Sequence, residues 1–173
     1  MNMELFLHEL GKRDGTLKRI ADWNQLADIE GDKIKCFIFR WIAFNGLYSA
    51  SYAMDYGQDN ADTEYEYRLI EEFNKKFILY DQALSPKIYS GAIEKVFKIN
   101  IKDKSNYMGT YLSNLEKEKN VNKKVCAMVM IAYKIRCRLF HGEKDPDLEV
   151  NVGVCDASDK VIAPILNYIL ENK

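Results

Sequence analysis

The feature that most constrains the fold is a long proline-free segment, residues 33–56, in which large side chains recur every three or four residues. This spacing places them on one face of an α-helix. The face comprises Ile34, Phe37, Ile38, Trp41, Asn45, Tyr48 and Tyr52. Phe39, Ile42 and Ala43 make the opposite side apolar too, which is typical of a central helix or of one at a subunit interface. Asn45 is either a hydrogen-bonded buried amide or a group that supports a site.

A second segment, residues 123–140, has a nearly all-apolar first half and predicts another core helix. Asn122 is suited to cap its start, and Gly142 is suited to end it. The sequence contains no internal repeat, low-complexity tract or linker. We therefore expect one all-α domain over residues 1–173, a compact antiparallel helical bundle with two long core helices and several shorter ones.

The shorter elements are less regular. Helices are predicted over residues 62–84, with Tyr65 on the buried face, over 86–96, over 103–119, and from Asp156 or Ser158 onward. Pro164 falls inside the last pattern, where it either kinks the helix or marks its true first turn. Residues 97–102 alternate in polarity and predict an extended connector, and residues 150–154 are a second extended candidate.

Composition excludes several classes of protein. The formal net charge of −1 argues against a non-specific nucleic-acid coat, although it permits a local basic patch. Four cysteines without a C-x-x-C pair and only two histidines predict neither a disulfide framework nor a metal site, and we expect no cofactor. No signal peptide is evident, and the longest apolar run, 125–133, is about half of the roughly 20 residues that a membrane span needs. We expect a cytoplasmic protein with no membrane partner.

The candidate site is the end of the second core helix, residues 133–144. Four cationic side chains, Lys134, Arg136, Arg138 and Lys144, lie close in sequence to His141. Guanidinium groups form forked hydrogen bonds with phosphate oxygens, and an imidazole transfers protons near neutral pH, so this set suits a phosphodiester. Basic residues are also what the last turn of any helix prefers, and the residues taken alone favour that second interpretation.

Helical spacing limits what one copy of this segment can do. At about 100° per residue, Arg136 and His141 are about 140° apart on a regular helix and do not share a face. Cys137 lies four residues before His141, which raises the idea of a thiol nucleophile with a base. Successive turns of one helix aim a nucleophile poorly, and no third orienting residue is evident, so this idea is not favoured.

The run Arg136-Cys-Arg-Leu-Phe-His141, with its continuation Leu-Phe-His-Gly-Glu-Lys, resembles the signature of the HEPN superfamily, an arginine followed by four to six residues and a histidine late in a helix. The earlier run Arg40-Trp-Ile-Ala-Phe-Asn-Gly-Leu-Tyr48 resembles the first core helix of such proteins. The resemblance implies an α-helical bundle that forms a homodimer and brings two Arg/His motifs into one cleft.

Active members of that superfamily are metal-independent endoribonucleases, many of them toxins or anti-phage effectors. The resemblance therefore implies that Arg136 holds the phosphate of an RNA substrate and that His141 transfers the proton, with Arg138, Lys144 and Asn45 binding substrate. Trp41 and Asn45 would support the site. An antitoxin or a nucleotidyltransferase is an implied partner.

Cys137 departs from the superfamily pattern, because a polar residue usually follows the arginine. A thiol is a weak hydrogen-bonding group. Two alternatives to a ribonuclease follow: a non-catalytic HEPN-like interaction or regulatory module, and a plain helical protein in which the Arg136–His141 run is only a helix end. The RNA target, the trigger and the neutralising partner do not follow from the residues.

Overall fold

The computed structural model describes residues 3–13, 15–79, 84–101, 106–143, 145 and 147–171. Within these residues the chain is helical and contains no β-strand, as predicted for an all-α bundle. The elements are α1 (Met3–Lys12), α2 (Thr16–Ile29), α3 (Lys33–Tyr56), α4 (Gln58–Thr63), α5 (Glu66–Phe73), the π-helix η1 (Asn74–Ile78), α6 (Ser85–Ile88), α7 (Gly91–Asn100), α8 (Asn106–Lys117), α9 (Val121–Phe140) and α10 (Glu149–Glu171).

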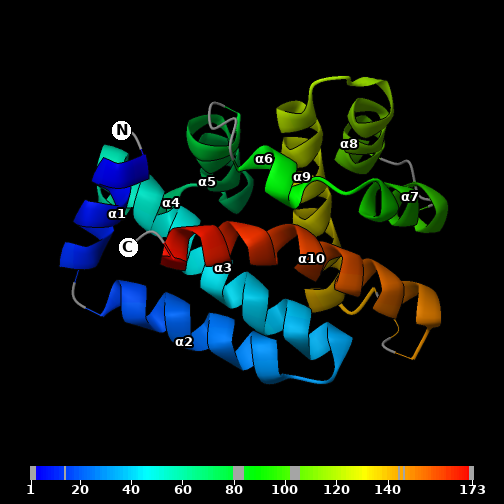
Figure 1. The fold of residues 1–173 in the computed structure, drawn as a ribbon, viewed down its shortest axis with the longest axis horizontal. Helices are drawn as coiled ribbons and strands as arrows, with labels where there is room; N and C mark the ends of the chain where they lie inside the picture. Colours follow the sequence, from blue (N-terminus) through cyan, green and yellow to red (C-terminus); the bar gives the residue numbers. More distant parts are fainter. Residues whose placement is uncertain are drawn as a thin grey trace.

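Helix α3 lies at the centre of the bundle. Figure 1 shows α3 beside α2 and α10, with α9 crossing this group steeply. The predicted apolar face is confirmed, because Phe37, Trp41 and Tyr48 are at most 2% exposed. Asp32 caps the helix, since its carboxylate accepts hydrogen bonds from the backbone N–H groups of Ile34 and Lys35 at 2.9 and 3.1 Å.

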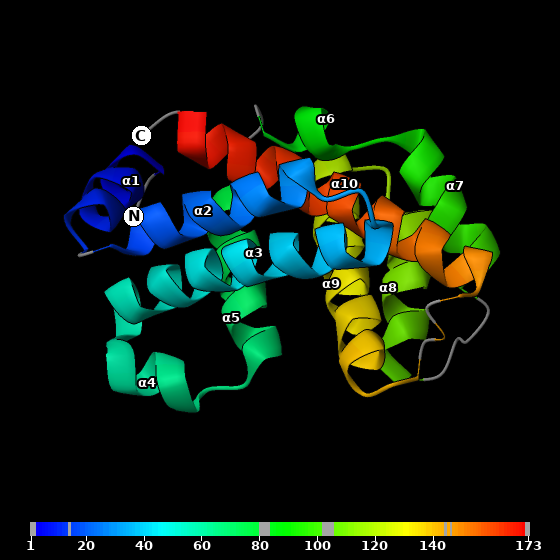
Figure 2. The same cartoon turned by 90° about the horizontal axis from the view of Figure 1, so that it is seen from below.

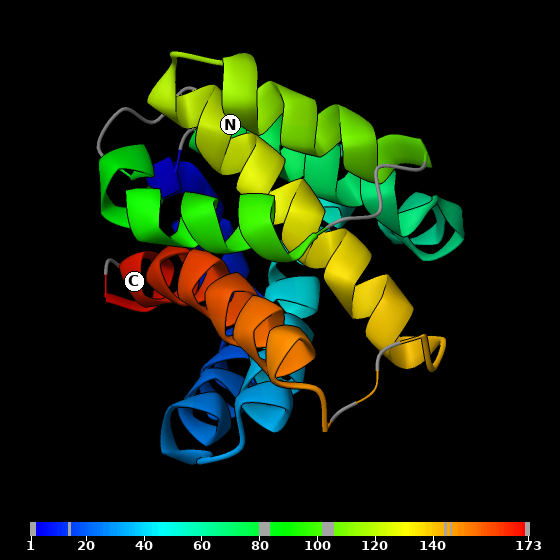
Figure 3. The same ribbon diagram turned by 90° about the vertical axis from the view of Figure 1, so that its right-hand side faces the viewer.

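Helix α9 is the second core helix, as predicted, and α8 runs alongside it (Figure 3). Its first half is buried at Val125, Met128 and Val129. The cap differs from the prediction: the Asn120 side chain accepts from the N–H of Lys123 at 3.2 Å. Asn122 instead donates its side-chain amide to the carbonyl of Leu79 at 2.9 Å and so joins α9 to the end of η1.

The predicted continuous helix over residues 62–84 is wrong. The backbone is extended at Glu64 and Tyr65, so α4 ends at Thr63 and α5 starts in a new direction. Tyr65 is 71% exposed, not buried. The break lets α5 bury Ile70 and Phe73 between α3 and α9, a tertiary gain that outweighs an uninterrupted local helix.

The predicted extended stretches are wrong over residues 97–100 and 150–154, which are helical; Ile101 is extended, and residues 102–105 lie outside the described residues. Helix α7 continues to Asn100, because Ile93 and Phe97 share one buried face, while Ile99 is 58% exposed. Helix α10 starts at Glu149 rather than at Asp156 or Ser158, since Val154 and Ser158 belong to the same buried face as the later residues. Pro164 therefore lies well inside α10 and does not mark its first turn.

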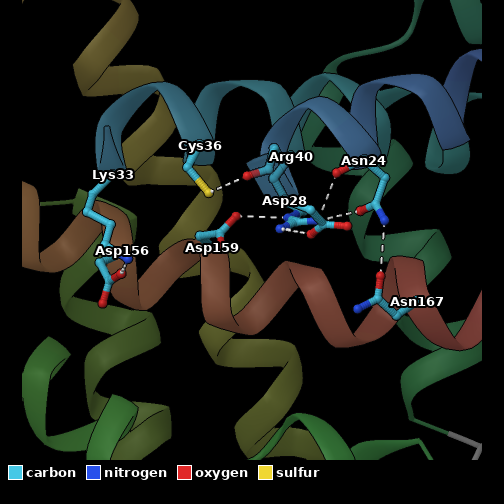
Figure 4. Close-up of polar contacts among 9 residues, drawn as sticks. Asn24, Asp28, Lys33, Cys36, Arg40, Asp156, Asp159 and Asn167 are labelled. Atoms are coloured by element: carbon cyan, nitrogen blue, oxygen red, sulfur yellow. Dashed lines mark hydrogen bonds and ion pairs between the residues drawn. The ribbon is translucent and has the colours of Figure 1, made fainter. Parts of the chain in front are cut away.

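Arg40 forms a buried polar cluster that joins three helices. The side chain, 4% exposed, donates from Nε to Asp159 Oδ1 at 2.9 Å, from Nη1 to Asn24 Oδ1 at 2.6 Å and from Nη2 to Asp28 Oδ1 at 2.8 Å. Asn24 in turn donates to Asn167 Oδ1 at 3.0 Å. Figure 4 shows the guanidinium between α2 and α10, so this Arg40 cluster fixes both helices on α3.

The charges of this cluster are set by their partners. Burial alone would lower the pKa of the Arg40 guanidinium, but Asp159 and Asp28 outweigh burial and raise it. Burial and the nearby charge of Asp159 raise the pKa of the Cys36 thiol to about 11. Cys36 therefore stays protonated, and its Sγ donates to the carbonyl of Ala27 at 3.2 Å.

Glu94 joins α7 to α9 at the far side of the bundle. Its carboxylate accepts from Lys124 Nζ and from the Tyr89 hydroxyl, both at 2.8 Å, and also from Lys98. Burial would raise the pKa of this carboxyl, but the three hydrogen bonds together outweigh burial and lower it to about 2.

This lowered pKa predicts a specific pH dependence of stability. Because the unfolded Glu94 carboxyl, with its usual pKa of 4.5, binds a proton before the folded one does, its stabilisation is present above pH 4.5 and is lost as the pH falls toward 2. Glu94→Gln should remove this part of the pH dependence, and urea unfolding across that range measures it. Glu116→Gln, a change at an exposed carboxylate on α8, should keep it. Identical pH dependence in wild type and Glu94→Gln would contradict the assignment.

Candidate functional site

The C-terminal end of α9 has the geometry that the sequence predicted. Gly142 adopts φ of 70°, the left-handed conformation. Its N–H donates to the carbonyl of Leu139 at 3.2 Å, and the N–H of Glu143 donates to the carbonyl of Arg138 at 2.9 Å, which together form a Schellman motif. His141 is the C-cap residue. Its side chain is exposed, and among the described residues it makes no hydrogen bond or ion pair.

Arg136 lies on a different side of the same helix end and is held by Glu66. The Arg136 Nη1 atom donates to Glu66 Oε2 at 2.9 Å, and the two side chains are only 25% and 23% exposed. The guanidinium also lies over the Phe140 ring, 4.7 Å from its centroid. Its Nε–H is buried and has no hydrogen-bond partner. The Arg136 guanidinium is therefore fixed in direction, but not all of its N–H donors have a hydrogen-bond partner.

A chain of polar groups from α3 supports Glu66. The Tyr48 hydroxyl and Trp41 Nε1 both donate to Glu66 Oε1, the latter at 3.3 Å. Asn45 donates its side-chain amide to the Tyr48 hydroxyl at 2.8 Å. Burial, reinforced by the charge of Glu66, raises the pKa of the Tyr48 phenol, so it remains a neutral donor. We call Trp41, Asn45, Tyr48, Glu66 and Arg136 the Glu66 network.

Cys137 faces aromatic packing. It is half-buried beside Tyr133, whose ring stacks on Trp41 with centroids 6.2 Å apart. Burial first and Cys137 second raise the pKa of the Tyr133 phenol. Among the described residues no hydrogen bond joins the Cys137 thiol to the His141 imidazole, so the geometry offers nothing in favour of a thiol nucleophile.

The other sequence-predicted residues have different surroundings. Arg138 is half-buried, with its Nε 3.8 Å from Glu143 Oε2. Lys144 lies outside the described residues. Asn45 is linked to Arg136 through Tyr48 and Glu66 rather than by direct contact. One copy of the chain therefore connects Asn45 with Arg136 but leaves His141 apart from both.

Glu66 is the residue that sequence reasoning missed. It was one of several acidic residues near the start of the predicted 62–84 helix, and its position gives no sign of a partner 70 residues later. Figure 2 shows why the two meet: the start of α5 and the last turns of α9 lie on the same side of the molecule.

Exposed aromatic rings surround this end of the site. Tyr65, Tyr67 and Phe140 are 71%, 36% and 56% exposed. The rings of Tyr65 and Tyr67 stack on each other with centroids 6.0 Å apart. Exposed rings beside an arginine can stack on unpaired bases, and they can also pack against a second protein surface.

In the part of the chain that the structure describes, no three His, Cys, Asp or Glu side chains are grouped so that they could hold a metal ion. No described helix is both long and apolar enough to cross a bilayer. Comparisons with models of protein families, with curated proteins and with solved structures returned no match for this chain.

Proposed function

We propose that this protein is a metal-independent endoribonuclease of the HEPN type, active as a homodimer whose cleft is built from two copies of the α9 end. The observation that carries the proposal is the arrangement at that end. A solvent-exposed histidine, His141, lies five residues beyond an arginine, Arg136, whose direction is fixed by the Glu66 carboxylate. A role as a toxin or in defence against phage rests on the sequence resemblance.

The chemistry follows from the two side chains. The neutral His141 imidazole accepts the proton of an RNA 2′-hydroxyl, and the resulting oxygen attacks the adjacent phosphorus. The bond from phosphorus to the 5′-oxygen breaks, and that oxygen takes up the proton from the His141 imidazolium. The products are a 2′,3′-cyclic phosphate and a 5′-hydroxyl. Arg136 stabilises the charge that develops on the phosphoryl oxygens.

The Glu66 network supports the part assigned to Arg136. The ion pair with Glu66 uses Nη1, and among the described residues the N–H groups of Nη2 and Nε take no partner. Arginine carries five N–H donors in a planar fork, so a phosphate can bind on the side away from Glu66. Glu66 is a positioning residue here, because it contacts Arg136 and not the reacting atoms.

A second copy supplies what one copy lacks. On a regular helix the two side chains of one chain are about 140° apart. A two-fold axis near the α9 end would place the Arg136 of one protomer near the His141 of the other. The exposed rings of Phe140, Tyr65 and Tyr67 give that end an apolar surface on which protomers can pack.

Mixed dimers test this arrangement directly. Arg136→Ala and His141→Ala should each be inactive on single-stranded RNA, and an equal mixture should recover cleavage, because the mixed dimer holds one intact pair. Mixing Arg136→Ala with the Arg136→Ala/His141→Ala double variant is the matched control and should stay inactive. All reactions contain a chelator, and an RNA with 2′-deoxyribose at the cleaved position should resist.

Each failure has its own meaning. If the mixture of folded, dimeric single variants stays inactive while wild type cleaves, the proposal that Arg136 and His141 of different protomers form one site is wrong. If folded, dimeric wild-type protein cleaves no RNA, the proposed ribonuclease activity is wrong.

A second candidate function is a non-catalytic HEPN-like binding module. The observation that favours it is the Arg136–Glu66 ion pair, which neutralises the charge expected to hold a phosphate. Cys137, at a position that is usually polar, agrees with it. Binding of RNA, or of a nucleotidyltransferase partner, by wild-type protein that never cleaves would support this module over the enzyme.

A further inference from the structure

An open pocket lies at the other end of α9 from the Glu66 network. It has a volume of about 490 Å³ and is bounded by the end of α5, by η1, by α8 and by the first half of α9. This volume falls within the range of about 300–1,000 Å³ that is common for small-molecule sites. Its apolar wall includes Leu79, Tyr111, Ala127 and Met130.

Asn74 lines this pocket and is only 4% exposed, yet its side-chain Oδ1 has no hydrogen-bond partner. Buried polar side chains are normally bonded, so an orphaned acceptor at a pocket wall calls for an explanation. Asn74 is also the first residue of the π-helix η1, where the N–H of Leu79 donates to its backbone carbonyl at 2.8 Å. Single π-turns within helices are frequent at functional sites.

Glu71 contributes a negative charge to the same wall. It precedes Asn74 by three residues, lines the pocket and is half-buried. Among the described residues its carboxylate forms no hydrogen bond or ion pair. Two residues whose side-chain acceptors have no hydrogen-bond partner among the described residues therefore line this pocket, Asn74 with a neutral acceptor and Glu71 with a carboxylate.

The two lysines at the pocket are already matched. Lys75 Nζ lies 2.7 Å from Glu72, and Lys123 Nζ lies 3.4 Å from Glu118. Cys126, also in the lining, adds no charge because burial raises the pKa of its thiol to about 12. The charge of Glu71 also acts on Lys75, but the three carboxylates of Glu71, Glu72 and Glu118 exceed the two lysines by one, and this net negative charge disfavours a phosphate or carboxylate ligand.

We propose that this pocket binds a small organic cation, an ammonium group carried on an apolar body. The ammonium donates to Asn74 Oδ1 and pairs with the Glu71 carboxylate. The apolar body packs against Met130, Leu79 and the ring of Tyr111. A charge-assisted hydrogen bond to a partly buried carboxylate gives the pocket its preference for a cation over a neutral molecule of the same shape.

The probes are three molecules of one shape: 2-phenylethylamine, the neutral 2-phenylethanol and the anionic 3-phenylpropionate. Calorimetry and amide chemical shifts are recorded on the full-length protein without RNA, so the outcome is independent of cleavage. We expect the amine to bind at least roughly tenfold more tightly than the alcohol, and the carboxylate not to bind. Glu71→Gln and Asn74→Leu should each weaken amine binding roughly tenfold, while Glu116→Gln, an equal change of charge outside the pocket, should not.

Several results would overturn the proposal. One is failure of wild-type protein to bind 2-phenylethylamine, and another is equal binding of the alcohol. Unchanged amine affinity in folded Glu71→Gln and Asn74→Leu is a third. A rise in thermal stability for Asn74→Leu, with no amine binding to wild type, would mark Asn74 as a buried orphan and nothing more.

Discussion

Alanine at position 141 is expected to lower the rate of RNA cleavage by about 10²–10⁴-fold, the usual contribution of a general acid–base group. The thermal unfolding temperature should not change, because the His141 side chain is exposed and makes no hydrogen bond or ion pair among the described residues. Single-turnover cleavage of a labelled RNA, with chelator present, measures the rate. Circular dichroism on the same samples measures the unfolding temperature.

The chain offers a matched control for this change. His8, the only other histidine, is exposed on α1 and far in sequence from the α9 end. His8→Ala should therefore cleave RNA at the wild-type rate. Equal activity of wild type and His141→Ala would remove His141 from the mechanism, and with it the ribonuclease proposal.

The largest expected effect on stability comes from Arg40. Replacing it with methionine removes the cation that Asp159 and Asp28 share and leaves Asn24 Oδ1 without its donor. Asp159 is 14% exposed, so its charge would stay largely buried and unpaired. Breaking a buried pair in this way costs about 3–5 kcal/mol of unfolding free energy. Urea denaturation followed by circular dichroism measures this loss.

Two further variants show whether the loss is electrostatic. Adding Asp159→Asn to Arg40→Met should recover part of the stability. The double variant no longer holds a buried carboxylate without a cationic partner. Lys33→Met breaks the more exposed pair with Asp156, 3.1 Å apart, and should cost at most about 1 kcal/mol. A similar small cost for Arg40→Met would mean that the cluster does not hold α2 and α10 on α3.

The long helices could be predicted because their signals are local and redundant. Helix α3 repeats its apolar spacing over six turns and carries its own cap in Asp32, and α9 ends at a glycine in the left-handed conformation that suits a C′ residue. Shorter sequence patterns gave wrong predictions of secondary structure. The alternation at Phe97 and Ile99 is equally compatible with the last turns of α7, and only packing on neighbouring helices distinguishes the two.

The candidate site divides in the same way. Arg136 and His141 were predicted because their run resembles the superfamily signature, and Trp41 and Asn45 because a second run resembles the first core helix of such proteins. Glu66 joins the two segments because its carboxylate accepts hydrogen bonds from both the Tyr48 hydroxyl and Arg136 Nη1, yet no local sequence pattern marked it. A residue whose role depends on contacts with segments far apart in sequence shows no periodic pattern from which that role could be predicted.

The sequence by itself determined the all-helical class, the two core helices and the helix end at Gly142, because each depends on residues within a turn or two of one another. Only the tertiary structure decided where α4 gives way to α5, why Arg40 is buried and which carboxylate holds Arg136. Those features depend on burial and charge pairing between helices, whose free energies exceed local preferences once the bundle is assembled.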